Sequence, residues 1–418
     1  MQLPATLRAL QYRNFQLFFS GQLISLIGTW MQTVAQSWLV YRLTGSSVLL
    51  GAIGFCSQVP VLLLAPVGGI VADRYNRRTV VIATQTAAML LALALALATA
   101  TLTGAVRIRC ILVLAALLGS VNAFDIPARQ SFIVEMVGQT DLMNAIALNS
   151  SMFNASRIIG PAVAGILVAR IGEAWCFFAN GVSYLAVIAG LLAMRVARRQ
   201  VQSAGSPLSR LEEGFRYVAG NLPIRSLLGL LAVVSLTAMP YTVLMPIFAD
   251  RILHGGPKAL GALLGATGIG ALMGALLLAT RSNLQGFGRG LAMAAAMFGA
   301  CLIAFSYSRL YWLSMGILVL AGFSMMVQVA ATNTLIQSMV PDRLRGRVMS
   351  IYSMVFMGMA PFGSLLAGWE AARFGPPAAV AAGGAFCILG AVAFTVILPR
   401  VRREARRLLR ERPAAYGN

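Results

Sequence analysis

Charged and metal-binding side chains are scarce in this sequence. Only 12 of its 418 residues are acidic, it has one histidine (His254), and charged residues of both signs make up 11% of the chain. The five cysteines lie far apart without a CxxC spacing, so neither a disulfide framework nor a thiolate metal site is indicated. No HExxH, GxSxG or Walker-type GxxxxGK[ST] pattern occurs. We therefore expect no enzymatic centre, no nucleotide hydrolysis, no metal and no cofactor.

Hydrophobic residues make up 59% of the chain, and its mean hydropathy is +0.80. They form continuous runs of about 20 residues or more, which is the length needed to cross the hydrocarbon core of a bilayer. The strands of a membrane β-barrel would instead alternate polar and apolar residues. The sequence therefore predicts an all-α polytopic membrane protein.

Twelve such runs can be counted along the chain. They are 14–41, 47–72, 79–102, 108–128, 142–170, 174–195, 224–249, 258–280, 290–307, 310–332, 347–370 and 377–399. The long polar interval after the sixth run divides them equally, and short similar stretches recur about 200–210 residues apart, as in transporters built from two parallel repeats. We expect a six-helix half at 1–196, a linker at 197–223, a second six-helix half at 224–399 and a basic tail at 400–418.

The formal net charge of +21 could indicate a nucleic-acid partner. However, the basic residues cluster at the ends of apolar runs, as orientation signals do. With both termini inside, the inner segments hold 24 of the 33 basic residues and the outer loops hold eight. We therefore expect a monomer in a bacterial-type inner membrane, with cytoplasmic termini, a tail on anionic lipid and no nucleic-acid partner.

Four charges stand in the short gap "GGIVADRYNRRTV" (68–80), between the second and third runs. The pattern G-x-x-x-D-R-x-x-R-R resembles the signature loop of the major facilitator superfamily. Its residues are Gly69, Asp73, Arg74, Arg77 and Arg78. Asn76 stands where family members usually have Gly, and asparagine tolerates positive φ better than most residues. The segments "NAFDIPARQSFIVEMV" and "RIIGPAVAG" resemble the branch that contains the enterobactin exporter and other secretion-type facilitators.

This resemblance implies two pseudo-symmetric six-helix halves that alternate in access, with the loop acting as a conformational latch. Carried over, Asp73 would face the start of the helix near Arg347, and Asp125 would pair with Arg77. A carboxylate is stabilised at a helix N-terminus, so the first contact is physically reasonable. The alternative is a loop whose charges serve only to orient the chain in the membrane.

Arg157 is the one basic residue well inside a run, and intramembrane charge normally faces a cavity or a partner. It is either an anchor for an anionic group of a solute or a structural arginine. Gly160, Pro161 and Gly165 follow it and resemble the helix-bending motif of antiporter branches, although Ser156 replaces the leading glycine of that motif. Pro361 stands in the eleventh run. Simple helix packing is the other interpretation of this set.

Several further polar side chains lie within apolar runs. Lining of a solute cavity and hydrogen bonding between helices are both possible roles for them. We take them as candidate solute-binding residues: Gln32, Gln36, Asn154, Tyr241, Gln328 and Asn333.

Together these features predict a secondary transporter that exports a small amphiphilic or anionic solute, siderophore-like or drug-like, by alternating access. The resemblance alone suggests that protons drive it. A flippase for lipid or lysophospholipid with the same fold is the alternative, since it would use the same polar side chains.

Overall fold

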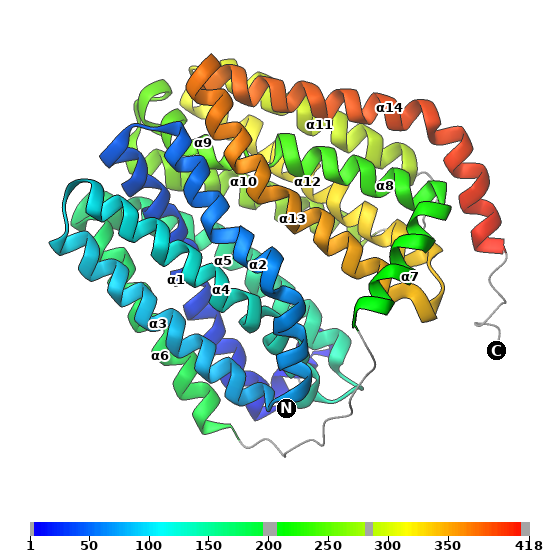
Figure 1. The fold of residues 1–418 in the computed structure, drawn as a ribbon, viewed down its shortest axis with the longest axis horizontal. Helices are drawn as coiled ribbons and strands as arrows, with labels where there is room; N and C mark the ends of the chain where they lie inside the picture. Colours follow the sequence, from blue (N-terminus) through cyan, green and yellow to red (C-terminus); the bar gives the residue numbers. More distant parts are fainter. Residues whose placement is uncertain (1–3, 195–206, 281–286, 411–418) are drawn as a thin grey trace. The chain divides into compact units, whose positions relative to one another are not determined.

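The computed structural model describes residues 4–194, 207–280 and 287–410, and within those ranges it contains helices and no strand (Figure 1). Eleven helical segments of the described residues are long and apolar enough to cross a membrane. The helix that covers the first expected run is the twelfth, and its amide, hydroxyl and tryptophan side chains give it a lower hydropathy. Twelve spanning segments are thus present, as expected.

The helices of the first half follow one another with short connections. They are η1 (Ala5–Gln11), α1 (Arg13–Thr44), α2 (Ser47–Arg74), α3 (Arg77–Thr101), α4 (Gly104–Val137), α5 (Leu142–Ile171) and α6 (Glu173–Ala193). The remaining helices are α7 (Pro207–Gly220), α8 (Leu222–Val233), η2 (Val234–Ala238), α9 (Tyr241–Ile247), η3 (Phe248–Ile252), α10 (Gly256–Ala279), α11 (Phe287–Tyr307), α12 (Tyr311–Met339), α13 (Asp342–Phe374) and α14 (Pro376–Arg410).

The chain divides into two compact units. Unit 1 comprises Met1–Ala204 and Pro246–Gly265, and unit 2 comprises Gly205–Met245 and Ala266–Asn418. The segment 246–265, which joins α9 to α10, therefore belongs with the N-terminal helices. The four domains expected from the sequence remain a prediction. Residues 195–206, which span the end of the expected first half and the start of the expected linker, and residues 411–418 of the expected tail lie outside the described residues.

Unit 1 is built on close pairing of its long helices. α2 packs along α4, α3 packs along both α4 and α6, and α1 packs along α5 and α6. Gly68 permits the closest of these approaches, because a Cβ atom there would collide with the carbonyl oxygen of Ala123 on α4. A glycine at such a crossing lets two membrane helices approach backbone to backbone.

The seventh span is interrupted, whereas the sequence predicts a continuous run at 224–249. It consists of α8, η2, α9 and η3, and η2 and η3 are short π-helical segments. Met239 donates its N–H to the carbonyl of Val234, five residues back. Pro240 follows and has no N–H to continue the α-helical pattern, which explains a break at this point.

Several helices extend beyond the apolar runs that predict them. α4 ends at Val137 rather than near 128, α13 begins at Asp342 rather than near 347, and α14 continues to Arg410 rather than ending near 399. Polar residues lower the hydropathy there without breaking the helix. In α4 they are paired within the protein, as the contacts of Arg129 and Glu135 show.

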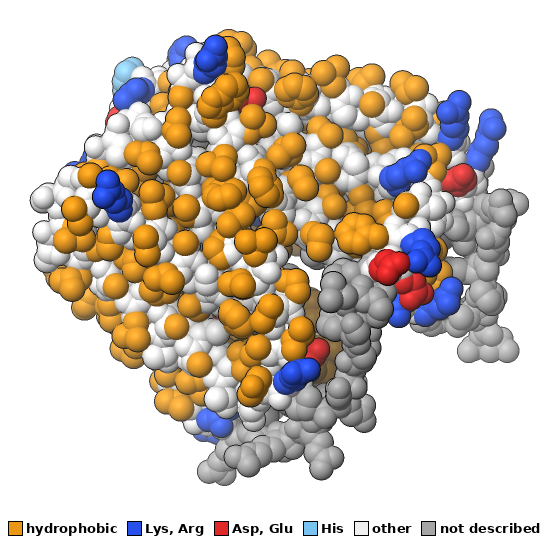
Figure 2. Space-filling model, in the orientation of Figure 1, with side chains coloured by type: hydrophobic (Ala, Val, Ile, Leu, Met, Phe, Trp, Pro, Cys, Tyr) orange, Lys and Arg blue, Asp and Glu red, His pale blue; other side chains and the backbone are white. Residues whose placement is uncertain are grey.

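Hydrophobic side chains cover most of the face drawn in Figure 2, and Lys and Arg side chains lie toward its edges. Many large apolar residues are exposed on the spanning helices, among them Leu63, Leu97, Leu192 and Val396. Exposed apolar side chains on helices of this length are expected where the solvent is lipid rather than water.

Candidate functional site

The loop between α2 and α3 is held to unit 1 by Arg77. Its Nη1 donates to the carboxylate of Glu135 at 2.9 Å and to the carbonyl of Ser131 at 3.0 Å, and its Nε donates to the carbonyl of Ala72 at 3.3 Å. The expected pairing of Arg77 with Asp125 is therefore wrong in this structure. α4 extends nine residues beyond the predicted span, and this extension brings Glu135 to the loop instead.

The adjacent Arg78 has a different partner. Its Nε and Nη2 donate to the carbonyls of Leu191 and Leu192 at 2.7 and 2.9 Å, at the end of α6. The last carbonyls of a helix lack intrahelical partners, and a cation there also interacts favourably with the helix dipole. Arg78 thus joins the start of α3 to the end of α6.

Asn76 and Gly69 behave differently from the sequence-based expectation. Asn76 has φ −61° and caps α3, accepting a hydrogen bond from the N–H of Thr79 at 3.2 Å. Asn76 therefore acts as the N-cap of α3, and its backbone does not adopt a positive φ. A Cβ at Gly69 would meet no atom within 4 Å, so the glycine needed for close packing is its neighbour Gly68.

Asp73 and Arg74 are exposed, whereas Arg77 and Arg78 are partly buried. The side chain of Asp73 is 67% exposed, and its Oδ1 lies 4.0 Å from Nη2 of Arg77. Arg347, near the expected partner of Asp73, belongs to unit 2 and forms an ion pair with Glu213 of α7. The latch contact of Asp73 stays a prediction.

The start of the chain is fixed to the α4–α5 turn through Asp141. This buried carboxylate accepts hydrogen bonds from Tyr12 at 2.8 Å and Gln11 at 3.3 Å, and it lies 3.4 Å from Nε of Arg8. The bond that Tyr12 donates to Asp141 raises the pKa of the Tyr12 phenol, because ionisation would break it. This cluster holds η1 against the start of α5.

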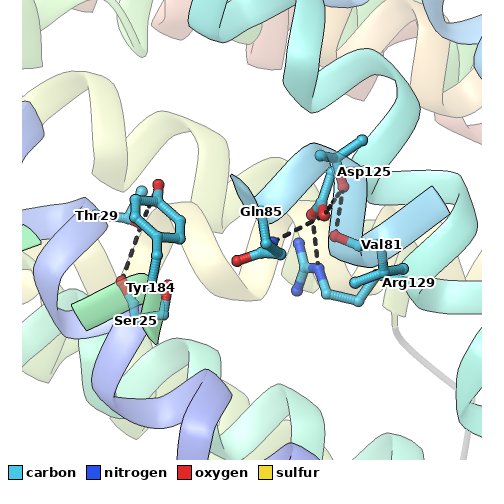
Figure 3. Close-up of polar contacts among 8 residues, drawn as sticks. Ser25, Thr29, Val81, Gln85, Asp125, Arg129 and Tyr184 are labelled. Atoms are coloured by element: carbon cyan, nitrogen blue, oxygen red, sulfur yellow. Dashed lines mark hydrogen bonds and ion pairs between the residues drawn. The ribbon is translucent and has the colours of Figure 1, made fainter. Parts of the chain in front are cut away.

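Asp125 lies in the interior of α4 and is 5% exposed. Its Oδ1 accepts hydrogen bonds from the Thr84 hydroxyl and the Gln85 amide, both at 2.8 Å, and its Oδ2 accepts from Nε of Arg129 at 3.0 Å (Figure 3). Arg129 is one turn further along the same helix, and its side chain is 17% exposed. A buried carboxylate and a guanidinium thus form a pair inside unit 1.

A cavity of about 50 Å³ adjoins this pair. Polar side chains from α1, α3, α4 and α6 dominate its lining: Gln22, Ser25, Thr29, Thr84, Gln85, Asn122, Asp125, Arg129 and Tyr184. The Oε1 atoms of Gln22 and Gln85 are buried and accept no hydrogen bond from a described residue. Tyr184 and Thr29 lie apart from Asp125 on the other side of Gln85 in the view of Figure 3, with their hydroxyl oxygens 3.4 Å apart.

Arg157 lies about halfway along α5 and is half-buried. Phe153 is one helical turn earlier on the same helix, so the two side chains share a face. The Phe153 ring packs edge-on against Trp30 of α1, with 5.7 Å between the ring centroids. Gly160 lets α5 approach α1 here, because a Cβ at Gly160 would collide with Trp30. A guanidinium and two aromatic rings are thus grouped on α1 and α5.

The helix-bending candidates lie in unbroken helices. Pro161 is inside α5 and Pro361 is inside α13. Gly165 faces the start of α10, where a Cβ would lie 2.8 Å from the carbonyl oxygen of Pro257. The glycines of this motif therefore serve close packing in this structure, and bending at the prolines stays a prediction.

The candidate solute-binding residues are dispersed. Gln32 is buried and accepts a hydrogen bond from Asn180 of α6 at 2.7 Å, which matches the interhelical alternative, and Gln36 is buried one turn further along α1. Asn154 donates to the carbonyl of Ser150 in its own helix. The others lie in unit 2: Tyr241, which bonds Thr267, Gln328, which is completely buried, and Asn333, which bonds Gln337.

The residues that surround Asp125 were not among those predicted from the sequence. Gln22, Thr84, Gln85, Arg129 and Tyr184 come from four helices, and their grouping depends on how these helices pack. One signal was available in the sequence, since Gln85 is the only amide in the third apolar run. An amide in a membrane span requires a hydrogen-bonding partner on a neighbouring helix.

Twelve spanning segments among the described residues and a charged α2–α3 loop are typical of a membrane transporter. The family model MFS_3, described as "Transmembrane secretion effector", matches residues 5–412, and the chain belongs to this family of the major facilitator superfamily. The resemblance inferred from the loop is thereby confirmed.

Known relatives of this chain are transporters. The chain is 25% identical to a staphyloferrin A transporter of Staphylococcus aureus, with 84% of this chain and 87% of the relative covered. It is 29% identical to the multidrug efflux pump Tap of Mycolicibacterium fortuitum, with 90% and 93% covered. It is 24% identical to the enterobactin exporter EntS of Shigella boydii, with 93% and 92% covered.

Solved structures show the same fold. A bacterial homologue of the human lysosomal transporter Spinster, in an inward-facing and unoccupied conformation, aligns with a TM-score of 0.70. The alignment covers 96% of this chain and 98% of the other at 17% sequence identity. This likeness confirms the twelve-helix major facilitator fold.

Proposed function

We propose that this protein is a secondary exporter of a small, amphiphilic, anionic solute of siderophore-like or drug-like character, which it moves by alternating access. In this proposal the chain works as a monomer in the inner membrane with both termini in the cytoplasm. The excess of basic residues in the segments on that side supports the orientation. The names of the three relatives, an exporter, an efflux pump and a siderophore-type transporter, support the solute class.

The observation that carries the proposal is the position of Arg157. A charge at the middle of a membrane helix costs about 2.5–3.5 kcal/mol on insertion scales, so it is retained where it faces water, a partner or a ligand. Arg157 shares a helix face with Phe153, a residue that is 43% exposed and whose ring packs against Trp30. A planar guanidinium grips carboxylate, catecholate or phosphate oxygens, and the neighbouring rings can pack against the apolar part of the same solute.

The α2–α3 loop supplies the conformational control in this proposal. Asp73 is exposed, whereas Arg77 and Arg78 are fixed within unit 1. An exposed carboxylate on a rigidly held turn is free to contact a helix N-terminus in one conformational state and to lose that contact in the other. Such a contact biases the equilibrium between the two states.

A binding screen with purified protein tests the proposal. The panel contains anionic siderophores, cationic drugs and lysophospholipids, and each is titrated against wild type, Arg157→Lys and Arg157→Ala. We expect an anionic amphiphile to bind, and we expect Arg157→Lys to weaken binding about tenfold, because a charge-assisted hydrogen bond is worth about 1.5–3 kcal/mol. Arg170→Lys, at the exposed end of the same helix, is the matched control. Binding of lysophospholipid alone would contradict the proposal and favour the flippase.

A further inference from the structure

Three buried carboxylates of unit 1 differ in what surrounds them. Asp141 precedes α5 and Glu173 begins α6, so both stand at helix N-termini, where a carboxylate is stabilised. Glu173 is also held by two hydrogen bonds from Arg42, at 2.8 and 3.0 Å. Asp125 instead lies inside α4, and among the described residues it accepts hydrogen bonds from the side chains of Thr84, Gln85 and Arg129. Of these three carboxylates, Asp125 is thus the one that does not lie at a helix terminus.

The depth of Asp125 can be estimated from its neighbours. Thr84 and Gln85 lie seven and eight residues after the start of α3, and Gln22 lies nine residues after the start of α1. At a rise of about 1.5 Å per residue, these positions are roughly 10–14 Å from the helix starts. The pair of Asp125 and Arg129 is therefore inside the span and away from the exposed loop, and the hydrogen bonds of the latch residue Arg77 go to Ala72, Ser131 and Glu135 instead.

The adjoining cavity is suited to water. Its volume of about 50 Å³ exceeds the roughly 10–15 Å³ that one buried water requires. Its lining offers two amide oxygens, Gln22 Oε1 and Gln85 Oε1, that accept no hydrogen bond from a described residue. A polar, roomy site with orphaned acceptors is where buried water is expected, and water beside a carboxylate can deliver or remove a proton.

Thr84 gives the cluster two hydrogen-bonding arrangements. Its hydroxyl oxygen lies 2.8 Å from Asp125 Oδ1 and 3.0 Å from the carbonyl oxygen of Val81, but the hydroxyl has a single proton to donate. With Asp125 ionised, the proton points to the carboxylate. With Asp125 protonated, it can turn to Val81 and stay bonded. The Thr84 hydroxyl therefore keeps a hydrogen-bond acceptor in either charge state of Asp125.

We propose that this cavity is a proton-binding site in which Asp125 is the acceptor. A hydronium ion in the cavity transfers a proton to the carboxylate, which becomes a neutral carboxyl group and leaves one water molecule. The ion pair with Arg129 is thereby lost, and the net charge of the pair rises from zero to +1. Release of the proton to cavity water restores the pair. The inference rests on the proposed function, because a proton site drives transport only in a protein that transports.

The groups that face Asp125 support a proton rather than a metal cation. Among the described residues around Asp125, Arg129 carries a charge. Tyr184 of α6 also lines the cavity and is titratable. The side chains that α1 and α3 contribute to the lining are uncharged. α2 approaches α4 here through Gly68, which carries no side chain. A sodium ion bound to Asp125 would share the carboxylate with the guanidinium of Arg129, which carries the same charge. A proton instead neutralises the carboxylate and ends its ion pair with the guanidinium.

Infrared titration of the purified protein tests the site without any solute. We expect the pH-difference spectrum of wild type to contain a carbonyl band of a protonated carboxyl group that is missing from the difference spectrum of Asp125→Asn. Glu173→Gln, which alters an equally buried acid paired with Arg42, is expected to keep it. Monodisperse elution shows which variants are folded, and Gln22→Leu, which replaces one orphaned acceptor and keeps Asp125, is expected to shift the titration.

Identical titrations of folded wild type and Asp125→Asn would overturn the proposal. The proposal would also be overturned if sodium raised the thermal stability of wild type but not of Asp125→Asn, while the infrared spectra of the two showed no difference in carboxyl protonation. Transport separates this site from the proposed function. We expect Asp125→Asn to lose accumulation of solute against a gradient and to retain exchange of solute at equal concentrations. If wild type shows the band but exports no anionic amphiphile, the proposed function fails and the proton site stands.

Discussion

The phenol of Tyr41, near the end of α1, donates a hydrogen bond of 2.8 Å to the carboxylate of Asp250, which follows 209 positions later in the chain. The guanidinium of Arg251 lies over the Tyr41 ring, 5.7 Å from its centroid. Both partners belong to the segment 246–265, which is grouped with the N-terminal helices in unit 1. Tyr41 therefore joins α1 to η3, the last part of the seventh span.

Replacing Tyr41 tests how much this connection stabilises the structure. Tyr41→Phe keeps the ring and the cation–π contact but removes the donor to a carboxylate, and such hydrogen bonds are worth about 1.5–3 kcal/mol. We expect a lower melting temperature in thermal unfolding of the purified protein. Tyr307→Phe, which alters a phenol on an exposed side chain of α11, is the control and should melt like wild type. Equal melting of Tyr41→Phe and wild type would show that the bond contributes nothing.

A second prediction concerns the close packing of α5 against α10. A Cβ at Gly261 would collide with the carbonyl oxygen of Pro161 and lie 3.1 Å from the Cα of Gly165. We expect Gly261→Ala to separate the two helices and lower thermal stability. Gly229→Ala in α8 is the matched control, because a Cβ there meets no atom within 4 Å. Alanine in an open helical position is expected to be neutral or to stabilise by about 0.5–1 kcal/mol.

Two substitutions at the α2–α3 loop and its contacts are expected to change different properties of the protein, one its stability and the other its transport. Glu135→Gln replaces the charged acceptor of Arg77 with a neutral one, so we expect it to lower thermal stability. Asp73→Asn changes a side chain that is 67% exposed, so we expect stability to be kept and transport to fall. A contact between a carboxylate and a helix terminus is worth about 0.3–2 kcal/mol, enough to shift a balanced equilibrium several-fold. Wild-type transport by well-inserted Asp73→Asn would count against the latch.

The outline of this molecule follows from the sequence because membrane insertion depends on properties that can be summed along the chain. Runs of apolar residues predict twelve spans, and the charged pattern from Gly69 to Arg78 identifies the family. The partner of Arg77 could not be predicted in this way. Hydropathy ends the fourth span near 128, but paired polar side chains carry the helix on to Val137 and bring Glu135 to the loop.

The cluster around Asp125 was missed for a related reason. Hydropathy treats Gln22, Thr84 and Gln85 as minor interruptions of apolar runs, and it carries no information about which faces of α1, α3 and α4 meet. Gln32 shows the same limit of the sequence. The sequence leaves both solute binding and interhelical hydrogen bonding open for it, and in the structure its amide oxygen accepts a hydrogen bond from Asn180. The chemistry of a polar residue in a span can be predicted from the sequence, but its partner depends on helix packing.

Gradient-driven transport in proteoliposomes tests the central claim most directly. Purified wild type, Arg157→Lys and the control Arg170→Lys are reconstituted at equal density, and accumulation of an anionic catecholate siderophore is followed with and without an imposed pH gradient. We expect wild type and Arg170→Lys to accumulate the solute only with the gradient, and Arg157→Lys to lose most of this activity because Lys lacks the planar fork. Accumulation by wild type no greater than in empty liposomes, or full activity of Arg157→Lys, would contradict the account.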